Sequence, residues 1–141
     1  MCLFRKKKPD PRLIELEAEY QNYRRRTRLE LQSADQSARK KVVQAFLPMY
    51  DDFERALSTP CQDDAYVQGI RLMQQNLLST LRELGVEPMD SLGRCFSPAY
   101  HEALAHVTDE SRGEEEIVQV LSVGFLMDGE VIRHAKVVVA N

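Results

Sequence analysis

The sequence predicts an α+β protein with a long paired N-terminal helix, a dimeric four-helix bundle and a small C-terminal all-β domain. Three observations predict it. An apolar stripe with helical spacing runs from about residue 11 to residue 57, a second amphipathic segment follows, and short β-rich segments begin after residue 88. We therefore expect a basic frayed N-terminus at 1–10, a long dimerising helix at 11–57, the second bundle helix at 58–87 and a compact β-domain at 88–141.

The apolar positions of the first helix recur at steps of three and four residues, which places them on one helix face. They are Leu13, Leu16, Tyr20, Tyr23, Thr27, Leu31, Ala34, Ala38, Val42, Ala45 and Met49. At about 1.5 Å per residue the helix would be about 70 Å long, which exceeds any domain that this chain could build to cover it. The stripe is therefore expected to pair with a second copy or with another protein. A solvated helix that needs no partner is the alternative.

The ends and the interior of this helix carry recognisable signals. Asp10 is a plausible N-cap with Pro11 at the first helical position, and Pro48 should remove one hydrogen bond and kink the helix, which then continues. From Thr27 onward the steps average about 3.67 residues, so a helix pair should run nearly straight or slightly right-handed. Its seam mixes small and bulky side chains where a zipper would place Leu and Ile, so it should melt first.

A second helix is expected from about Asp63 to Leu84, with Gly85 as a left-handed cap and Pro88 preventing continuation. Two copies of this helix on two copies of the long helix's end would make a four-helix bundle. The predicted dimer interface comprises Leu16, Tyr20, Tyr23, Leu31, Val42, Phe53, Leu77 and Leu81.

The β-domain is predicted from strand and turn signals. Ile117 to Phe125 is interpreted as one strand and Val131 to Val139 as another, while Asp128-Gly129 between them is typical of a type I′ hairpin. One helical turn is expected within residues 98–103. A domain of about fifty residues is near the lower limit for independent folding, so it should lean on the helices.

Charge is uneven along the chain, which has a formal net charge of −3. Residues 1–47 hold twelve Lys and Arg against six Asp and Glu, so a basic helix joins an acidic remainder. No apolar run is long enough for a membrane span, and the basic start lacks the apolar core of a secretory signal. Three cysteines without Cys-x-x-Cys spacing suit free thiols in a reducing compartment, so the cytoplasm is the expected location.

No catalytic or metal motif was found. His101 and His106 do not have the spacing of a helical ligand pair, His134 is assigned to a strand, and surface or turn histidines are the favoured interpretation. The adjacent acidic residues, such as Asp51 and Asp52, are interpreted as solvated charge. The basic run at 24–28 could belong to a DNA-binding dimer, but the stripe passes through it, so a basic collar for an acidic partner surface is favoured.

Six blocks of sequence resemble the GrpE family, in order and at the family's spacing. They are residues 19–27 (EYQNYRRRT), 47–57 (LPMYDDFERAL), 68–70 (QGI), 85–88 (GVEP), 96–103 (FSPAYHEA) and 131–139 (VIRHAKVVV). The resemblance, which covers about residues 13–140, implies a homodimeric nucleotide exchange factor of DnaK-type chaperones. It implies that a β-domain engages the chaperone's ATPase domain so that ADP leaves. It implies that the protein makes or breaks no bond itself, so no enzymatic activity is expected. No cofactor, nucleic acid or membrane partner is expected either.

The resemblance also assigns a chaperone-binding set. Arg24, Arg55 and Gly69 match helix positions of the contact surface. Pro98 and Val139 match β-domain contact positions, and Phe96 and Leu121 occupy apolar contact positions with different side chains; core packing is the alternative for these four. His134 falls where the family often has Pro, and the basic start differs from the family's usual acidic extension. A coiled-coil scaffold or holdase chaperone without exchange activity is the alternative function.

Overall fold

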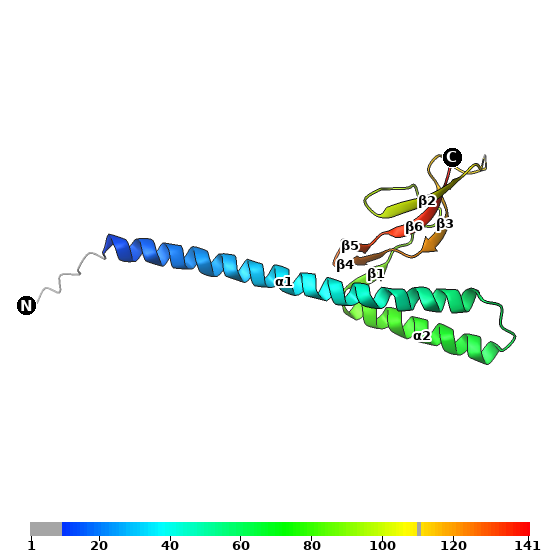
Figure 1. The fold of residues 1–141 in the computed structure, drawn as a ribbon, viewed down its shortest axis with the longest axis horizontal. Helices are drawn as coiled ribbons and strands as arrows, with labels where there is room; N and C mark the ends of the chain where they lie inside the picture. The colour runs from blue at the N-terminus through cyan, green and yellow to red at the C-terminus, as the bar shows by residue number, and fades with distance from the viewer. Residues whose placement is uncertain (1–9, 110) are drawn as a thin grey trace, which may run out of the picture. The chain divides into compact units, whose positions relative to one another are not determined.

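The computed structural model describes residues 10–109 and 111–141. Its elements are α1 (Pro11–Ser58), α2 (Asp64–Glu83), β1 (Val86–Pro88), β2 (His101–Val107), β3 (Ile117–Ser122), β4 (Phe125–Met127), β5 (Glu130–Arg133) and β6 (Ala135–Ala140) (Figure 1). The chain divides into residues 1–39 and residues 40–141, and we call the second part the body. The α+β class is confirmed. Of the expected basic start at 1–10, residues 1–9, with Cys2, lie outside the described residues.

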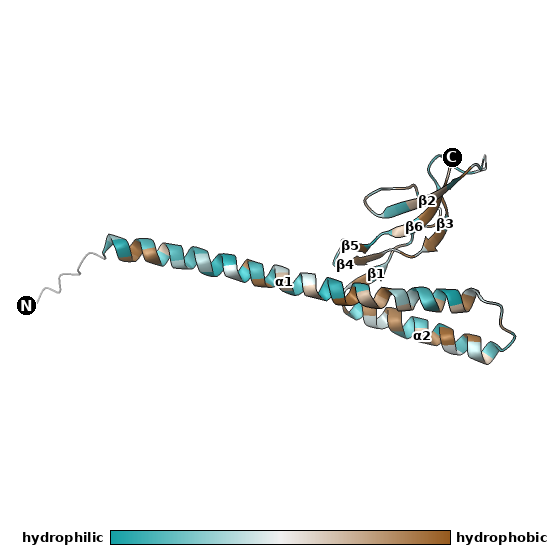
Figure 2. Cartoon of the chain, viewed as in Figure 1, coloured by the Kyte–Doolittle hydropathy of each residue, from teal (hydrophilic) through white to brown (hydrophobic). Residues whose placement is uncertain are grey.

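Residues 10–39 form the first part of α1, which begins as predicted. The Asp10 carboxylate accepts a hydrogen bond from the amide of Arg12 at 3.0 Å, and its carbonyl accepts from the amides of Leu13 and Ile14. Hydrophobic residues recur along this part of the helix between polar ones (Figure 2). Nowhere in residues 10–109 and 111–141 is a helix long and apolar enough to cross a membrane.

Both helices of the body follow the sequence signals. α1 continues without interruption through Pro48. α2 is capped by Asp63, whose carboxylate accepts from the amides of Ala65 and Tyr66 at 3.0 and 3.2 Å. The chain leaves α2 through Gly85 with φ of +78°, the left-handed conformation expected of that cap.

Two three-stranded sheets make up the rest of the body, with strand orders β1-β4-β5 and β2-β6-β3. β2 runs parallel to β6, and the remaining pairs are antiparallel. Asp128 and Gly129 have φ of 51° and 83°, which confirms the type I′ turn between β4 and β5.

The two predicted long strands were wrong in one respect, because each is divided between the two sheets. The segment 117–125 is split into β3 and β4 at Gly124, where an added Cβ would lie 2.6 Å from the backbone nitrogen of Ala135. The segment 131–139 is split into β5 and β6 at His134, which therefore lies between strands and not within one. The expected helical turn at 98–103 is a single turn on the Ser97 carbonyl, followed by β2.

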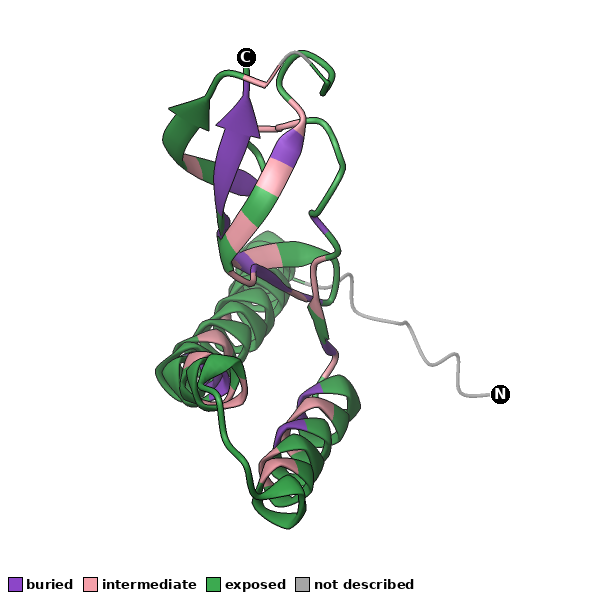
Figure 3. Ribbon diagram, turned by 90° about the vertical axis from the view of Figure 1, so that its right-hand side faces the viewer, coloured by how far each residue is buried: buried purple, intermediate pink, exposed green. Residues whose placement is uncertain are grey.

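The body has two hydrophobic cores. The first joins α1, α2 and the sheet β1-β4-β5, and its buried residues are Val43, Leu47, Tyr50, Leu81, Val86, Phe125, Met127 and Ile132. The second lies on the sheet β2-β6-β3, around Ile117, Ala135, Val137 and Val139. β6 is buried over most of its length (Figure 3). The sheet β1-β4-β5 thus packs on the helices through the first core, in keeping with the expectation that the β-domain leans on them.

Candidate functional site

A surface groove in the body brings two predicted contact residues together. It is about 600 Å³ in volume and lies between the last turns of α1, the strand β3 and Lys136 of β6. Arg55 lies on its helical wall and Leu121 on its strand wall. Leu121 is 50% exposed, and the Arg55 guanidinium is exposed beside its ion-pair partner Asp52. Because apolar, basic and acidic side chains line the groove, among them Leu121, Arg55 and Glu54, it suits a protein surface of mixed polarity.

Gly69 lies on an exposed part of α2, outside this groove. A Cβ built on Gly69 meets no atom within 4 Å, so packing inside this chain does not explain a glycine there. Glycine in a helix interior costs about 1 kcal/mol relative to alanine. The open space above Gly69 is therefore consistent with the predicted approach of another surface.

The remaining predicted contact positions of the β-domain have different surroundings. Pro98 is exposed in the turn before β2, and Phe96 is half-buried against the second core. Val139 is 1% exposed on the central strand β6 and paired with β2 and β3 on either side. Its side chain therefore packs in the second core, which was the alternative for this position, and its contact role stays a prediction.

The predicted dimer residues are exposed along most of α1. In residues 10–39, the side chains of Leu16, Tyr20, Tyr23 and Leu31 are all more than half exposed. Arg24, a predicted chaperone contact, is also exposed there, with its guanidinium 5.8 Å from the centroid of the Tyr20 ring. This helix face has nothing of its own chain covering it within residues 10–39.

In the body, the predicted dimer residues range from exposed to buried. Val42 is exposed, whereas Phe53 and Leu77 are half-buried. Leu81 is 4% exposed because it packs in the first core of the same chain. Leu81 is thus already covered by its own chain, and its place in the dimer interface stays a prediction.

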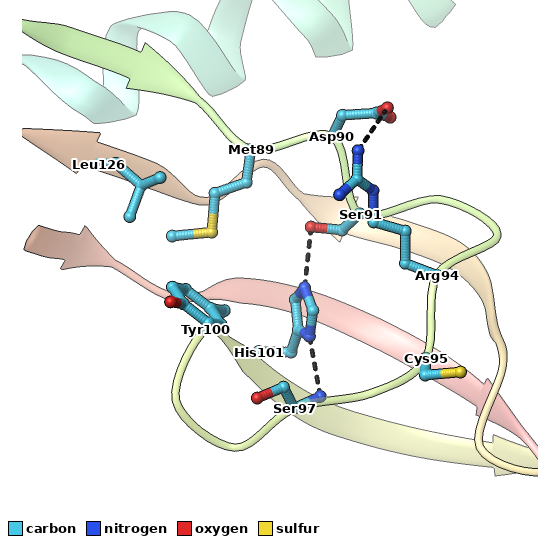
Figure 4. A pocket seen from close by; sticks show the side chains of 9 residues that line it. All are labelled: Met89, Asp90, Ser91, Arg94, Cys95, Ser97, Tyr100, His101 and Leu126. Carbon is cyan, nitrogen blue, oxygen red and sulfur yellow. Dashed lines mark hydrogen bonds and ion pairs between the residues drawn. The ribbon is translucent and has the colours of Figure 1, made fainter. Parts of the chain in front are cut away.

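A pocket of about 460 Å³ lies beside the turn that precedes β2 (Figure 4). At its edge, the imidazole of His101 is 9% exposed and makes two hydrogen bonds: Nδ1 accepts from the amide of Ser97 at 3.0 Å, and Nε2 lies 3.1 Å from Oγ of Ser91. Because Nδ1 is an acceptor, the neutral ring carries its proton on Nε2 and donates it to Ser91. The ring therefore cannot serve as a base toward that hydroxyl.

The surroundings of His101 favour its neutral form. Burial lowers the pKa of His101 below its ordinary value, and the nearby charges of Arg94 and His134 lower it further. The prediction of a surface or turn histidine was wrong for His101, which is a buried structural link between the segment before β2 and the loop after β1. The burial of His101 was missed because β2 was not predicted. With β2 known, the alternation of side chains between the two faces of a strand could have placed His101 on a buried face.

Sequence reasoning also missed an ion pair between α1 and β5. Arg133 donates from Nη1 and Nη2 to the two carboxylate oxygens of Asp51, at 2.8 Å each. The interpretation of Asp51 as solvated charge was therefore wrong, whereas its neighbour Asp52 is exposed. Adjacent helix residues point in different directions, so one member of such a pair can face a packed surface while the other faces water.

The exposed apolar face of α1 and the groove of the body are both surfaces of the kind that bind other proteins. These two features are typical of a protein that acts by binding other proteins. Comparison with known proteins assigns the family. The sequence profile described as GrpE matches residues 6–141, so the chain belongs to the GrpE family.

Individual relatives agree with that assignment. The chain is 38% identical over 130 residues to "Protein GrpE" of Clostridium acetobutylicum, covering 92% of this chain and 64% of the relative. It is 35% identical to "Protein GrpE" of Lachnoclostridium phytofermentans, covering 92% and 59%, and 37% identical to that of Histophilus somni, covering 96% and 72%. The chain thus spans about three fifths of the length of the first two relatives.

Proposed function

We propose that this chain is a nucleotide exchange factor that binds the ATPase domain of a DnaK-type chaperone and accelerates the release of ADP. The observation that carries the proposal is the family match over residues 6–141, because exchange on DnaK-type chaperones is what membership of that family implies. The exposed groove with Arg55 and Leu121 supports it as a surface for the chaperone. The proposed binding set is Arg24, Arg55, Gly69, Phe96, Pro98, Leu121 and Val139, of which Val139 is buried in this chain.

The proposed mechanism is a coupling between two ligands of the chaperone. This chain would bind the opened nucleotide cleft more tightly than the closed one, and ADP would do the reverse. Each therefore lowers the affinity of the other, and ATP binding, which closes the cleft, ejects the exchange factor. In this proposal the residues of this chain bind the chaperone and orient the β-domain on it. They make or break no covalent bond.

The proposed assembly is a homodimer in the cytoplasm. The long helix at 11–57 would pair through its exposed stripe, residues 58–87 would complete a four-helix bundle, and residues 88–141 would carry the chaperone-binding surface. The uncovered side chains of Leu16, Tyr23 and Leu31 support the pairing. Sedimentation equilibrium should give twice the mass of one chain, and a single-chain mass at working concentrations would contradict the dimer.

Stopped-flow fluorescence tests the exchange activity directly. A fluorescent ADP analogue is loaded on the cognate DnaK-type chaperone and chased with ATP, with and without this protein. We expect release to accelerate with the concentration of this protein and to saturate. No acceleration at micromolar concentrations would remove the exchange-factor proposal.

The alternative, a scaffold or holdase without exchange activity, draws on the same exposed apolar side chains of α1. A holdase would suppress the aggregation of an unfolding client in the absence of any chaperone partner. Suppression of aggregation without an effect on ADP release would favour this alternative. Acceleration of ADP release without suppression would favour exchange.

A further inference from the structure

A polar seam joins α1 to β5 inside the body. Lys40, Gln44 and Asp51 project from α1 at spacings of four and seven residues, which places them on one helix face. Their partners are the carboxylate of Glu130, the carbonyl of Ile132 and the guanidinium of Arg133, respectively. The seam therefore adds polar contacts between the helix and β5 to the apolar contacts of the first core.

Arg133 makes the most extensive contacts of the seam. Besides its two bonds to Asp51, it donates from Nε and Nη2 to the carbonyl of Val123 at 3.0 and 2.6 Å. Its guanidinium also lies 5.2 Å from the ring centroid of the buried Phe125. Val123 is in the short link between β3 and β4, where the chain passes from one sheet to the other. One side chain therefore ties α1 to the crossing point of both sheets.

The other two links constrain this arrangement less. The Lys40–Glu130 pair has a largely exposed carboxylate, and such pairs contribute little to stability. Gln44 makes one bond, from Nε2 to the Ile132 carbonyl at 2.5 Å. The Asp51–Arg133 pair is instead bidentate and partly buried, which fixes direction as well as distance.

We infer that Arg133 is a positioning residue, which holds the sheets of the body in one orientation on α1 so that the β-domain opens a partner as a rigid arm. The activity readout of this inference rests on the proposed function. If the β-domain moved freely on the helix, it could still bind the chaperone. It would then discriminate less between the opened and the closed nucleotide cleft, so binding would open the cleft less. The predicted defect is therefore in the maximal rate of ADP release and not in the affinity of docking.

Conservative variants test the role without removing the whole side chain. Arg133→Lys keeps the charge and the aliphatic stem but loses the planar fork that binds a carboxylate and a carbonyl together. Asp51→Asn keeps the volume at the other end. Asp90→Asn is the matched control, because Asp90 is an exposed carboxylate of the body with a single 3.5 Å contact to Arg94.

Spin labels on the chain's own thiols report the orientation. Cys61 in the loop after α1 and Cys95 in the β-domain are both exposed, so a Cys2→Ser background can carry one label at each. Pulsed dipolar spectroscopy on labelled protein diluted with unlabelled protein then gives the distance between them within one chain. We expect a broader distance distribution in Arg133→Lys and in Asp51→Asn, and the unchanged distribution in Asp90→Asn.

The exchange assay is run on the same variants. We expect the maximal rate of ADP release to fall by about tenfold, the factor that one charge-assisted hydrogen bond contributes to an equilibrium. An unchanged half-saturating concentration is expected of Arg133→Lys alone, because Asp51 also lines the groove proposed for the chaperone. An unchanged distance distribution in Arg133→Lys would overturn the inference, and so would a broadened distribution with an unchanged maximal rate. Loss of helical circular dichroism in both variants would also overturn it, because it would show a folding role.

Failure of the proposed function is distinguishable from failure of this inference. If the wild-type protein does not accelerate ADP release, the exchange proposal falls and the label distances alone decide the positioning role. A broadened distribution in Arg133→Lys then supports it, and an unchanged one refutes it.

Discussion

Replacing Gly69 with alanine should stabilise the protein and weaken its binding to the chaperone. Gly69 lies within α2, in an ordinary helical conformation, and an added Cβ meets no atom within 4 Å. The substitution therefore gains helix propensity without a clash in this chain. Any cost must come from a surface that only a partner supplies.

The expected changes in stability and in affinity follow from the gain in helix propensity and from the close approach of a partner. Alanine is favoured over glycine in a helix interior by about 1 kcal/mol, which corresponds to a rise in melting temperature of roughly 4–8 °C for a domain of this size. If a partner approaches Gly69 closely, the added methyl group overpacks that contact at a cost of about 1–3 kcal/mol, or roughly tenfold or more in affinity. Gly69→Asp should weaken binding further, because it adds a larger and charged side chain.

Urea unfolding at one fixed protein concentration and titration calorimetry with the chaperone's ATPase domain measure the two effects. Gly124→Ala is the control for a glycine that this chain does need, because its Cβ would lie 2.6 Å from the backbone nitrogen of Ala135. It should destabilise the protein by about 1–3 kcal/mol. A destabilised Gly69→Ala variant, or one that no longer dimerises, would show that the glycine serves packing between copies and would refute the reasoning.

Three further predictions concern the groove, the buried histidine and the long helix. Leu121→Ser should raise the half-saturating concentration in the exchange assay by about tenfold and leave the melting temperature unchanged, because Leu121 is a half-exposed contact residue. The pKa of His101 is lowered in the folded protein, mainly by burial, so the unfolded chain binds the proton first as pH falls below the ordinary value of 6.5. The urea midpoint should therefore decrease from pH 8 to pH 5.5, and less so in His101→Asn; an equal decrease would exclude His101 as the cause. Residues 11–39 should melt reversibly below the unfolding temperature of the body, and one transition in both circular dichroism and calorimetry would contradict this.

The helices were predictable because their signals are local. The three- and four-residue spacing, the caps at Asp10 and Asp63 and the left-handed Gly85 all act within a few residues of the chain. The Asp128-Gly129 turn is equally local, since its two residues supply both positive φ angles. Each of these features can be inferred without knowing what the segment packs against.

The arrangement of strands was not predictable in the same way. The segment 101–107 (HEALAHV), with two Ala, one Glu and one Leu, has more helical than strand propensity, yet it pairs in parallel with β6, which lies far away in sequence. Gly124 gave a local sign of a break between β3 and β4, whereas His134 gave none for the break between β5 and β6. Partner choice between two sheets depends on non-local pairing and burial, which one-dimensional periodicity does not contain.

The candidate site shows the same division. Arg55 and Leu121 entered through the resemblance, but only the fold places them on facing walls of one groove. Asp51 lines that groove too, and its carboxylate is held by Arg133 from the other side of the helix–sheet seam. The same ion pair therefore links the wall of the groove to the polar seam between helix and strands. Substitution of a contact residue such as Leu121 should accordingly change the half-saturating concentration in the exchange assay. Substitution of the positioning residue Arg133 should instead change the maximal rate of ADP release, so one titration of the exchange assay separates the two roles.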